Sequence, residues 1–138
     1  MPMPEMPVPQ NSIRKHCVLV VDDLVDVANA LARVLRAMGH EVYVANDGSA
    51  GIDAAEKLRP DVILLDIGMP GLDGYDVCRR IRQQPWGKDI LITALTGWDG
   101  ESDVRRAKAA GFNRHLSKPV QTSTLAKLFA SGTRVRSH

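Results

Sequence analysis

Residues 61–74, DVILLDIGMPGLDG, decide the fold that this sequence predicts. Within them, residues 62–65 form an unbroken apolar run with Pro60 shortly before it, which is typical of a strand buried on both faces of a parallel sheet. The run ends at Asp66, and four Gly or Pro residues between positions 68 and 74 predict an irregular loop. Because ligands of open parallel sheets bind at the carboxyl ends of the strands, Asp66 is where we expect chemistry.

A second apolar run, residues 18–21, also ends in acids, at Asp22 and Asp23. Shorter apolar segments predict three more strands, and the segments between the strands predict helices. These strands are expected at 41–45, 90–95 and 112–116, and the helices at 27–38, up to about 58, from 75 to before Pro85, at 101–110 and around 125–129. The first of these helices is predicted to be amphipathic, because apolar residues recur at helical spacing along one face. They are Val27, Ala30, Leu31, Val34, Leu35 and Met38.

Five strands that alternate with five helices predict an α/β fold, a doubly wound parallel (βα)5 sheet with right-handed crossovers. For five strands we expect the flavodoxin-like order 2-1-3-4-5. We expect residues 1–16 to form a disordered, proline-rich leader, residues 17–131 the single domain, and residues 132–138 a polar tail.

The composition limits the partners and the compartment. The 138 residues are 44% hydrophobic and 25% charged, and their net charge of +2 is too small to indicate a nucleic acid or an anionic membrane as partner. No apolar run reaches the length of a membrane span, and the N-terminus lacks the pattern of a signal peptide. Cys17 and Cys78 lie in apolar segments and are expected to be buried free thiols, so we expect a cytoplasmic protein.

The expected strand order brings the ends of the first and third strands together, and with them Asp22, Asp23 and Asp66. Three adjacent carboxylates repel one another, and a hard divalent cation relieves that repulsion. Mg²⁺ prefers carboxylate, carbonyl and water oxygens, so the sequence predicts a Mg²⁺ site, with Mn²⁺ as the alternative ion.

Thr96 and Lys118 stand at the ends of the fourth and fifth strands, at the same edge. A hydroxyl and an ammonium that face a carboxylate form a cradle for phosphoryl oxygens, and a carboxylate can attack phosphorus. Taken singly, each residue is more often a helix cap or a solvated strand end. The functional interpretation depends on all of them meeting at one edge.

Four motifs with matching spacing make the chain resemble the receiver domain of bacterial two-component response regulators, over about residues 17–130. They are VLVVDD at 18–23, LLDIGMPGLDG at 64–74, ALTG at 94–97 and LSKPV at 116–120. Thr96 follows Asp66 by thirty residues and Lys118 follows it by fifty-two, as in that family.

The resemblance implies roles for single residues. Asp66 would be the phosphoacceptor, Lys118 would bind a phosphoryl oxygen, and the bond from Lys118 to Pro119 would be cis. Mg²⁺ would be bound directly by Asp23, Asp66 and the backbone carbonyl of Gly68, and by Asp22 mostly through water.

The resemblance also implies a switch, in which Thr96 moves toward the phosphoryl group and an aromatic ring three residues before Lys118 turns inward. This chain departs from the family there, because the residue is His115. One interpretation is a half-exposed strand residue without a special role. The other is a switch ring that also titrates.

We therefore expect a single-domain signalling switch, not a classical enzyme, that takes a phosphoryl group from a sensor histidine kinase or a histidine-containing phosphotransfer protein. Output would pass to a protein target through the fourth helix, fifth strand and fifth helix, without direct contact with nucleic acid or membrane. The alternatives are a receiver segment of a hybrid sensor kinase, and a phosphate sink or docking module. A flavodoxin would need a phosphate loop where Asp22 and Asp23 stand, and a haloacid-dehalogenase-type phosphatase a second acid where Gly68 stands.

Overall fold

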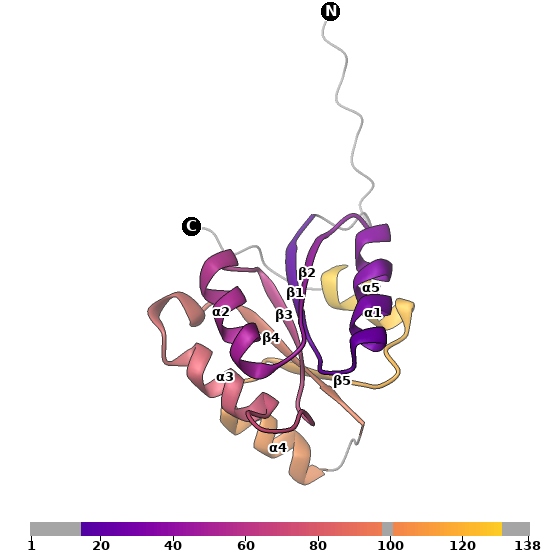
Figure 1. Ribbon diagram of the computed structural model, residues 1–138. Helices are drawn as coiled ribbons and strands as arrows, with labels where there is room; N and C mark the ends of the chain where they lie inside the picture. Colours follow the sequence, from indigo (N-terminus) through magenta and orange to yellow (C-terminus); the bar gives the residue numbers. More distant parts are fainter. Residues whose placement is uncertain (1–14, 98–100, 131–138) are drawn as a thin grey trace, which may run out of the picture.

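The computed structural model describes residues 15–97 and 101–130, without the side chains of residues 101–103 (Figure 1). Residues 1–14 of the predicted leader and the predicted polar tail lie outside the described residues. The strands are β1 (Cys17–Val21), β2 (Glu41–Ala45), β3 (Val62–Asp66), β4 (Leu91–Thr96) and β5 (Arg114–Ser117). The helices are α1 (Val25–Ala37), α2 (Gly48–Leu58), α3 (Gly74–Arg82), the 3₁₀ turn η1 (Pro85–Gly87), α4 (Glu101–Ala110) and α5 (Thr122–Ala130).

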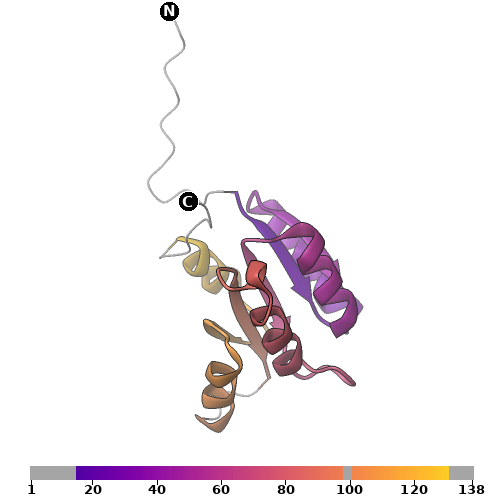
Figure 2. The same ribbon diagram turned by 90° about the vertical axis from the view of Figure 1, so that its left-hand side faces the viewer.

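The five strands form one parallel sheet in the order β2-β1-β3-β4-β5, which confirms the predicted fold class and strand order. Helices cover both faces of the sheet (Figures 1 and 2). Alternate residues of β3 show why its sequence is apolar throughout: Ile63 and Leu65 pack toward α2, α3 and α4, whereas Val62 and Leu64 pack toward α1 and α5. All four are fully buried, as expected for a central parallel strand.

The prediction for the buried face of α1 was wrong in part. Val27 and Ala30 are exposed, and Ala28 and Ala32 are buried instead, together with Leu31 and Leu35. Small alanines let the helix lie close to the sheet, and the apolar spacing alone does not distinguish such a face from its neighbour. The displaced Val27 lines a groove between α1 and the segment that follows β5.

β5 begins two residues later than expected, since Phe112 is not paired in the sheet. Its ring packs edge-on against Tyr75 of α3, at 6.2 Å between ring centroids. The strand that follows is short and mostly exposed, at the edge of the sheet.

The packed domain includes His16, which the sequence analysis placed at the end of the leader. Its side chain is 2% exposed, and its ring lies 5.3 Å from Phe129 and 5.5 Å from His40, between ring centroids. Both cysteines are free thiols; Cys78 is buried, as predicted, and Cys17 is partly buried. None of the helices in the described ranges has both the length and the apolar character of a bilayer-spanning segment.

Candidate phosphoryl-transfer and metal site

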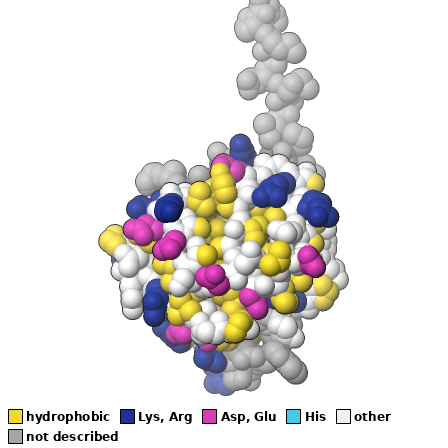
Figure 3. Space-filling model, viewed as in Figure 1, with side chains coloured by type: hydrophobic (Ala, Val, Ile, Leu, Met, Phe, Trp, Pro, Cys, Tyr) yellow, Lys and Arg dark blue, Asp and Glu magenta, His cyan; other side chains and the backbone are white. Residues whose placement is uncertain are grey.

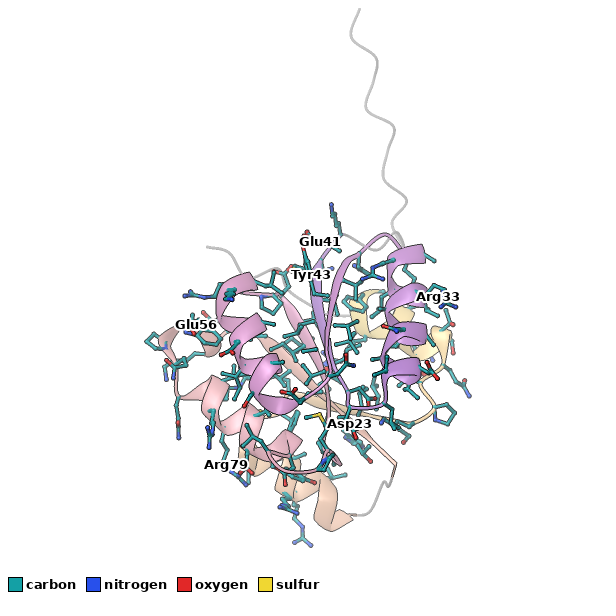
Figure 4. All side chains as sticks on the ribbon, in the orientation of Figure 1. Asp23, Arg33, Glu41, Tyr43, Glu56 and Arg79 are labelled. Carbon is teal, nitrogen blue, oxygen red and sulfur yellow. The ribbon has the colours of Figure 1, made fainter. Side chains whose placement is uncertain are left out.

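The acidic residues meet at the carboxyl ends of β1 and β3. Asp22 follows β1 directly and is fully buried, and Asp66 is the last residue of β3 and is 6% exposed. The Asp22 backbone is fixed to the neighbouring strand: its N–H donates to Ala45 and its carbonyl accepts from Asn46 Nδ2 at 2.9 Å. Figure 4 shows Asp23 at this end of the sheet and Glu41 at the opposite end, where β2 begins.

Each buried carboxylate divides its two oxygens between a backbone N–H and a lysine. Asp66 Oδ1 accepts from the Gly68 N–H at 2.9 Å, and Asp22 Oδ1 accepts from the Leu24 N–H at 3.0 Å. Lys118 Nζ lies 3.1 Å from Asp22 Oδ2 and 3.2 Å from Asp66 Oδ2. One ammonium therefore bridges the two carboxylates that the sequence predicted to converge.

This arrangement leaves the site short of positive charge. Burial raises the pKa of Asp22 above its usual value, although the Leu24 N–H and Lys118 act in the opposite direction. Burial also pulls the pKa of Lys118 down, but the two carboxylates outweigh it and the net direction is upward. The charged lysine therefore offsets only part of what it costs to bury the Asp22 carboxylate.

The donor set fits a hard divalent cation. Asp22, Asp23 and Asp66 each offer an oxygen, and these ligand atoms all lie within 4.8 Å of one another. Carboxylate oxygens suit Mg²⁺, and Asp23 is partly exposed to solvent, which fits an ion that keeps several water ligands. The structure brings together the three acids that the sequence indicated.

Thr96 and Lys118 are tied to each other through the backbone. Thr96 ends β4 and is 4% exposed, and its carbonyl accepts from the Lys118 N–H at 2.8 Å. The Lys118–Pro119 peptide bond is cis. His115 lies elsewhere: it is exposed on β5, two strands away from Asp66 in the sheet.

Two supporting residues were missed by the sequence reasoning. Gly74 begins α3, and a Cβ there would lie 2.5 Å from the Asp66 carbonyl oxygen, so only glycine lets the helix approach the loop so closely. Asn46 holds the Asp22 carbonyl, yet in the sequence it reads only as part of a turn. A glycine at the start of a helix, directly after the Asp66 loop, could have indicated this close approach from the sequence. The hydrogen bond from Asn46 could be found only in the structure.

Residues 18–130 match the protein family described as response regulator receiver domain. The chain belongs to this family. Among curated relatives, this receiver domain is 36% identical over 110 residues to the protein PilH of Pseudomonas aeruginosa, covering 80% of this chain and 91% of PilH. It is 35% identical over 119 residues to the response regulator PleD of Caulobacter vibrioides, covering 86% of this chain but only 26% of PleD.

Solved structures show the same relationship. The chemotaxis protein CheY4 of Vibrio cholerae superposes with a TM-score of 0.80 at 32% identity, covering 83% of this chain and 96% of CheY4. The receiver domain of the sensor histidine kinase PA1611 from Pseudomonas aeruginosa gives 0.77 at 31% identity, covering 86% of this chain and all of that one. The PA1611 structure has a magnesium ion coordinated in its active site cleft. Receiver domains are signalling switches of two-component systems, which accounts for an acidic pocket in a domain of this kind.

Proposed function

We propose that Asp66 accepts a phosphoryl group from the phosphohistidine of a sensor histidine kinase or a histidine-containing phosphotransfer protein. The observation that carries the proposal is the Asp66 carboxylate itself: it is nearly buried at a strand end, with one oxygen on a backbone N–H and the other 3.2 Å from Lys118 Nζ. A carboxylate held in this way has its orientation fixed before the donor arrives.

In the proposed step, an Asp66 oxygen forms a bond to phosphorus as the bond from phosphorus to the histidine nitrogen breaks. The electron pair of that bond stays on the imidazole, which takes a proton from solvent. Lys118 would move its ammonium onto a phosphoryl oxygen and compensate the added negative charge. Thr96 would place its hydroxyl on another oxygen, because it stands at the same edge of the sheet.

Mg²⁺ would be held by Asp23, Asp66 and the backbone carbonyl of Gly68, with Asp22 acting mostly through water, and Mn²⁺ would satisfy the same oxygen donors. When bound, the ion supplies the positive charge that the site lacks and neutralises phosphoryl oxygens. The burial of Asp22 and the spacing of the three acids support this assignment.

The proposed output is a protein target that contacts α4, β5 and α5, under the control of Thr96 and His115. On this proposal the domain is a switch and not a classical enzyme, since it is itself modified. Two free thiols support a reducing compartment, the cytoplasm. The alternatives are a receiver segment of a hybrid sensor kinase, and a phosphate sink or docking module. The similarity to the receiver domain of the sensor histidine kinase PA1611 supports the first alternative.

The test is intact-mass spectrometry after incubation with acetyl phosphate and Mg²⁺. We expect one added phosphoryl group, which is lost when EDTA is present and absent from Asp66→Asn. Asp76→Asn is the matched control, because Asp76 lies in the first turn of α3 and pairs with Arg79 outside the acidic cluster. A phosphate-release assay distinguishes rapid turnover from inertness: an unmodified protein that also releases no phosphate would refute the proposal.

A further inference from the structure

A groove with an apolar lining lies between α1 and α5, and we call it the α1–α5 groove. Its volume is about 420 Å³. One wall is a face of α1 with the residue before that helix, and the other is the start of α5 with the segment before it. Leu24, Val27 and Val34 belong to the first wall, and Val120 and Leu125 to the second. Leu24 is 53% exposed and Val27 is 41% exposed, so this wall leaves large apolar side chains open to solvent.

The lining of the α1–α5 groove carries almost no charge. Lys118 is its one charged residue within the described ranges, and the ammonium of that lysine is held between Asp22 and Asp66. On the face shown in Figure 3, by contrast, acidic and basic side chains are interspersed with apolar ones. Because the groove offers no charge that is not already paired, an apolar segment fits it better than an acidic or a basic one.

Residues 1–14 join the domain beside one end of this groove. The connection runs through Lys15 and His16, and His16 is buried between the ends of the two helices. Its backbone N–H donates at 3.1 Å to Nδ1 of His40, which follows α1, and its ring centroid lies 5.3 Å from that of Phe129 in α5. These helices lie on the same side of the sheet and also form the walls of the groove (Figure 1).

The sequence before Lys15 contains an apolar segment with a regular pattern. Residues 1–9 are three Met, four Pro and one Val, with Glu5 as their one charge. Met3 and Met6 each precede a proline, and both proline and the residue before it favour the extended polyproline II conformation. This conformation has three residues per turn, so Met3, Met6 and Pro9 would share one side of it.

The length of this segment matches the groove. A polyproline II helix rises about 3.1 Å per residue. Pro9 and Met6 precede Lys15 by six and nine residues, which correspond to about 19 Å and about 28 Å. The 13 residues of α1 span about 20 Å. A segment that starts at Lys15 and follows α1 therefore brings Pro9 and Met6 to the part of the groove next to the acidic pocket.

We propose that residues 3–9 of this chain bind in the α1–α5 groove as a polyproline II helix. Met3 and Met6 would contact the apolar lining, because an unbranched thioether adapts to an irregular surface. The short connection to Lys15 gives the segment an effective concentration of about 1 mM, so a dissociation constant below about 1 mM keeps the groove occupied more than half of the time. This inference goes beyond the proposed function and does not depend on phosphorylation.

The first test compares methyl NMR spectra of the full chain, recorded without a phosphodonor, so that its failure would leave the phosphorylation assay untouched. In the Met3→Ser, Met6→Ser variant, the methyl signals of Val27 and Val34 should shift, because their apolar contacts are lost. The methyl signals of Ile52, which packs on the other face of the sheet, should stay in place. Unchanged signals at Val27 and Val34 would overturn the proposal and leave the groove to a partner protein.

Matched controls separate the apolar segment from the rest of the chain. Gln10→Ser, Asn11→Ser changes two polar residues of the same leader and should leave the groove signals in place. Val27→Glu puts a charge on an exposed position of the groove, and Asn29→Glu puts one on an exposed position of α1 that does not line it. The leader substitutions should still shift Val34 in the Asn29→Glu background, but no longer in Val27→Glu. Equal effects in both backgrounds would contradict the proposed contact.

The second test supplies the segment as a separate molecule. A fluorescein-labelled peptide of residues 1–14 should bind the Met3→Ser, Met6→Ser chain at least about twofold more tightly than the wild-type chain, because the wild-type leader competes at about 1 mM. No binding to either chain, or equal binding to both, would refute the proposal. Groove shifts that grow with protein concentration would also refute it, since the occupant would then be the leader of a second copy.

Discussion

Lowering the pH should destabilise this domain through one buried histidine, His40. Its side chain is 5% exposed, its ring centroid lies 4.2 Å from that of Phe129, and its Nδ1 accepts the His16 N–H at 3.1 Å. Burial, together with the neighbouring His16, lowers the pKa of His40 from 6.5 to about 4. The neutral ring is therefore the form that the packed cluster accommodates.

The magnitude follows from the two pKa values. Above pH 6.5 the ring is neutral in both the folded and the unfolded chain, and its contribution to stability is fully present. As the pH falls from 6.5 toward 4, the unfolded chain binds a proton that the folded domain does not, so the free energy of unfolding decreases. Over the whole window the loss amounts to about 3 kcal/mol.

Urea unfolding at several pH values between about 7 and about 4.5 measures this loss. His40→Asn places an amide oxygen near the position of Nδ1 and removes the titrating ring, so its stability at neutral pH should fall while its pH dependence becomes shallower. His115→Asn is the control, since His115 is exposed on β5, and it should keep the full pH dependence. If His40→Asn and the wild type lose the same free energy over this range, the cluster is not the source and the reasoning is refuted.

Three further substitutions test how the site and its surroundings are held. Lys118→Met leaves two carboxylates without their cation. The free energy of unfolding should fall by about 1–3 kcal/mol in EDTA, and by less when Mg²⁺ is present. An equal loss in EDTA and in Mg²⁺ would argue against a shared cation site. Gly74→Ala should lower the free energy of unfolding in urea by about 1–3 kcal/mol and should slow phosphorylation. Gly97→Ala is the control: a Cβ there has no atom within 4 Å, so the free energy of unfolding should fall by less than about 0.5 kcal/mol. Arg82→Met removes hydrogen bonds to three backbone carbonyls, two between α3 and β4 and one after α4, and should cost about 2–4 kcal/mol in the same assay. Arg79→Met, at an exposed ion pair, should cost under about 0.5 kcal/mol, and similar losses for the two arginines would contradict the role assigned to Arg82.

The sheet and the acidic cluster were predictable because both follow from local pattern and simple topology. Two continuous apolar runs that end in acids specify central parallel strands, and adjacent strands must then bring Asp22 and Asp66 together. No long-range detail is needed for that inference. The same holds for Lys118, because a lysine at the end of the fifth strand reaches the same edge.

The predictions from sequence were wrong where tertiary contacts determine which residues are buried. Ala28 and Ala32 face the sheet because close packing against it favours small residues, which hydrophobic spacing does not reveal. His16 was assigned to the leader and His40 lies between two elements, yet both are buried against Phe129, which is far along the chain in α5. Their burial depends on where α5 lies, and that position is not encoded near either histidine.

β5 connects the acidic pocket with the face proposed for output, because Lys118 follows directly after its last residue. The Lys118 N–H is bonded to Thr96, and its ammonium bridges two carboxylates. If a phosphoryl group on Asp66 draws that ammonium and Thr96 toward itself, the end of a four-residue strand must adjust, and this strand belongs to the face proposed for output. Linkage then requires reciprocity. If phosphorylation changes the affinity for the target by some factor, the bound target changes the phosphorylation equilibrium by the same factor. A target bound to this face would therefore help to determine how much of the domain carries a phosphoryl group.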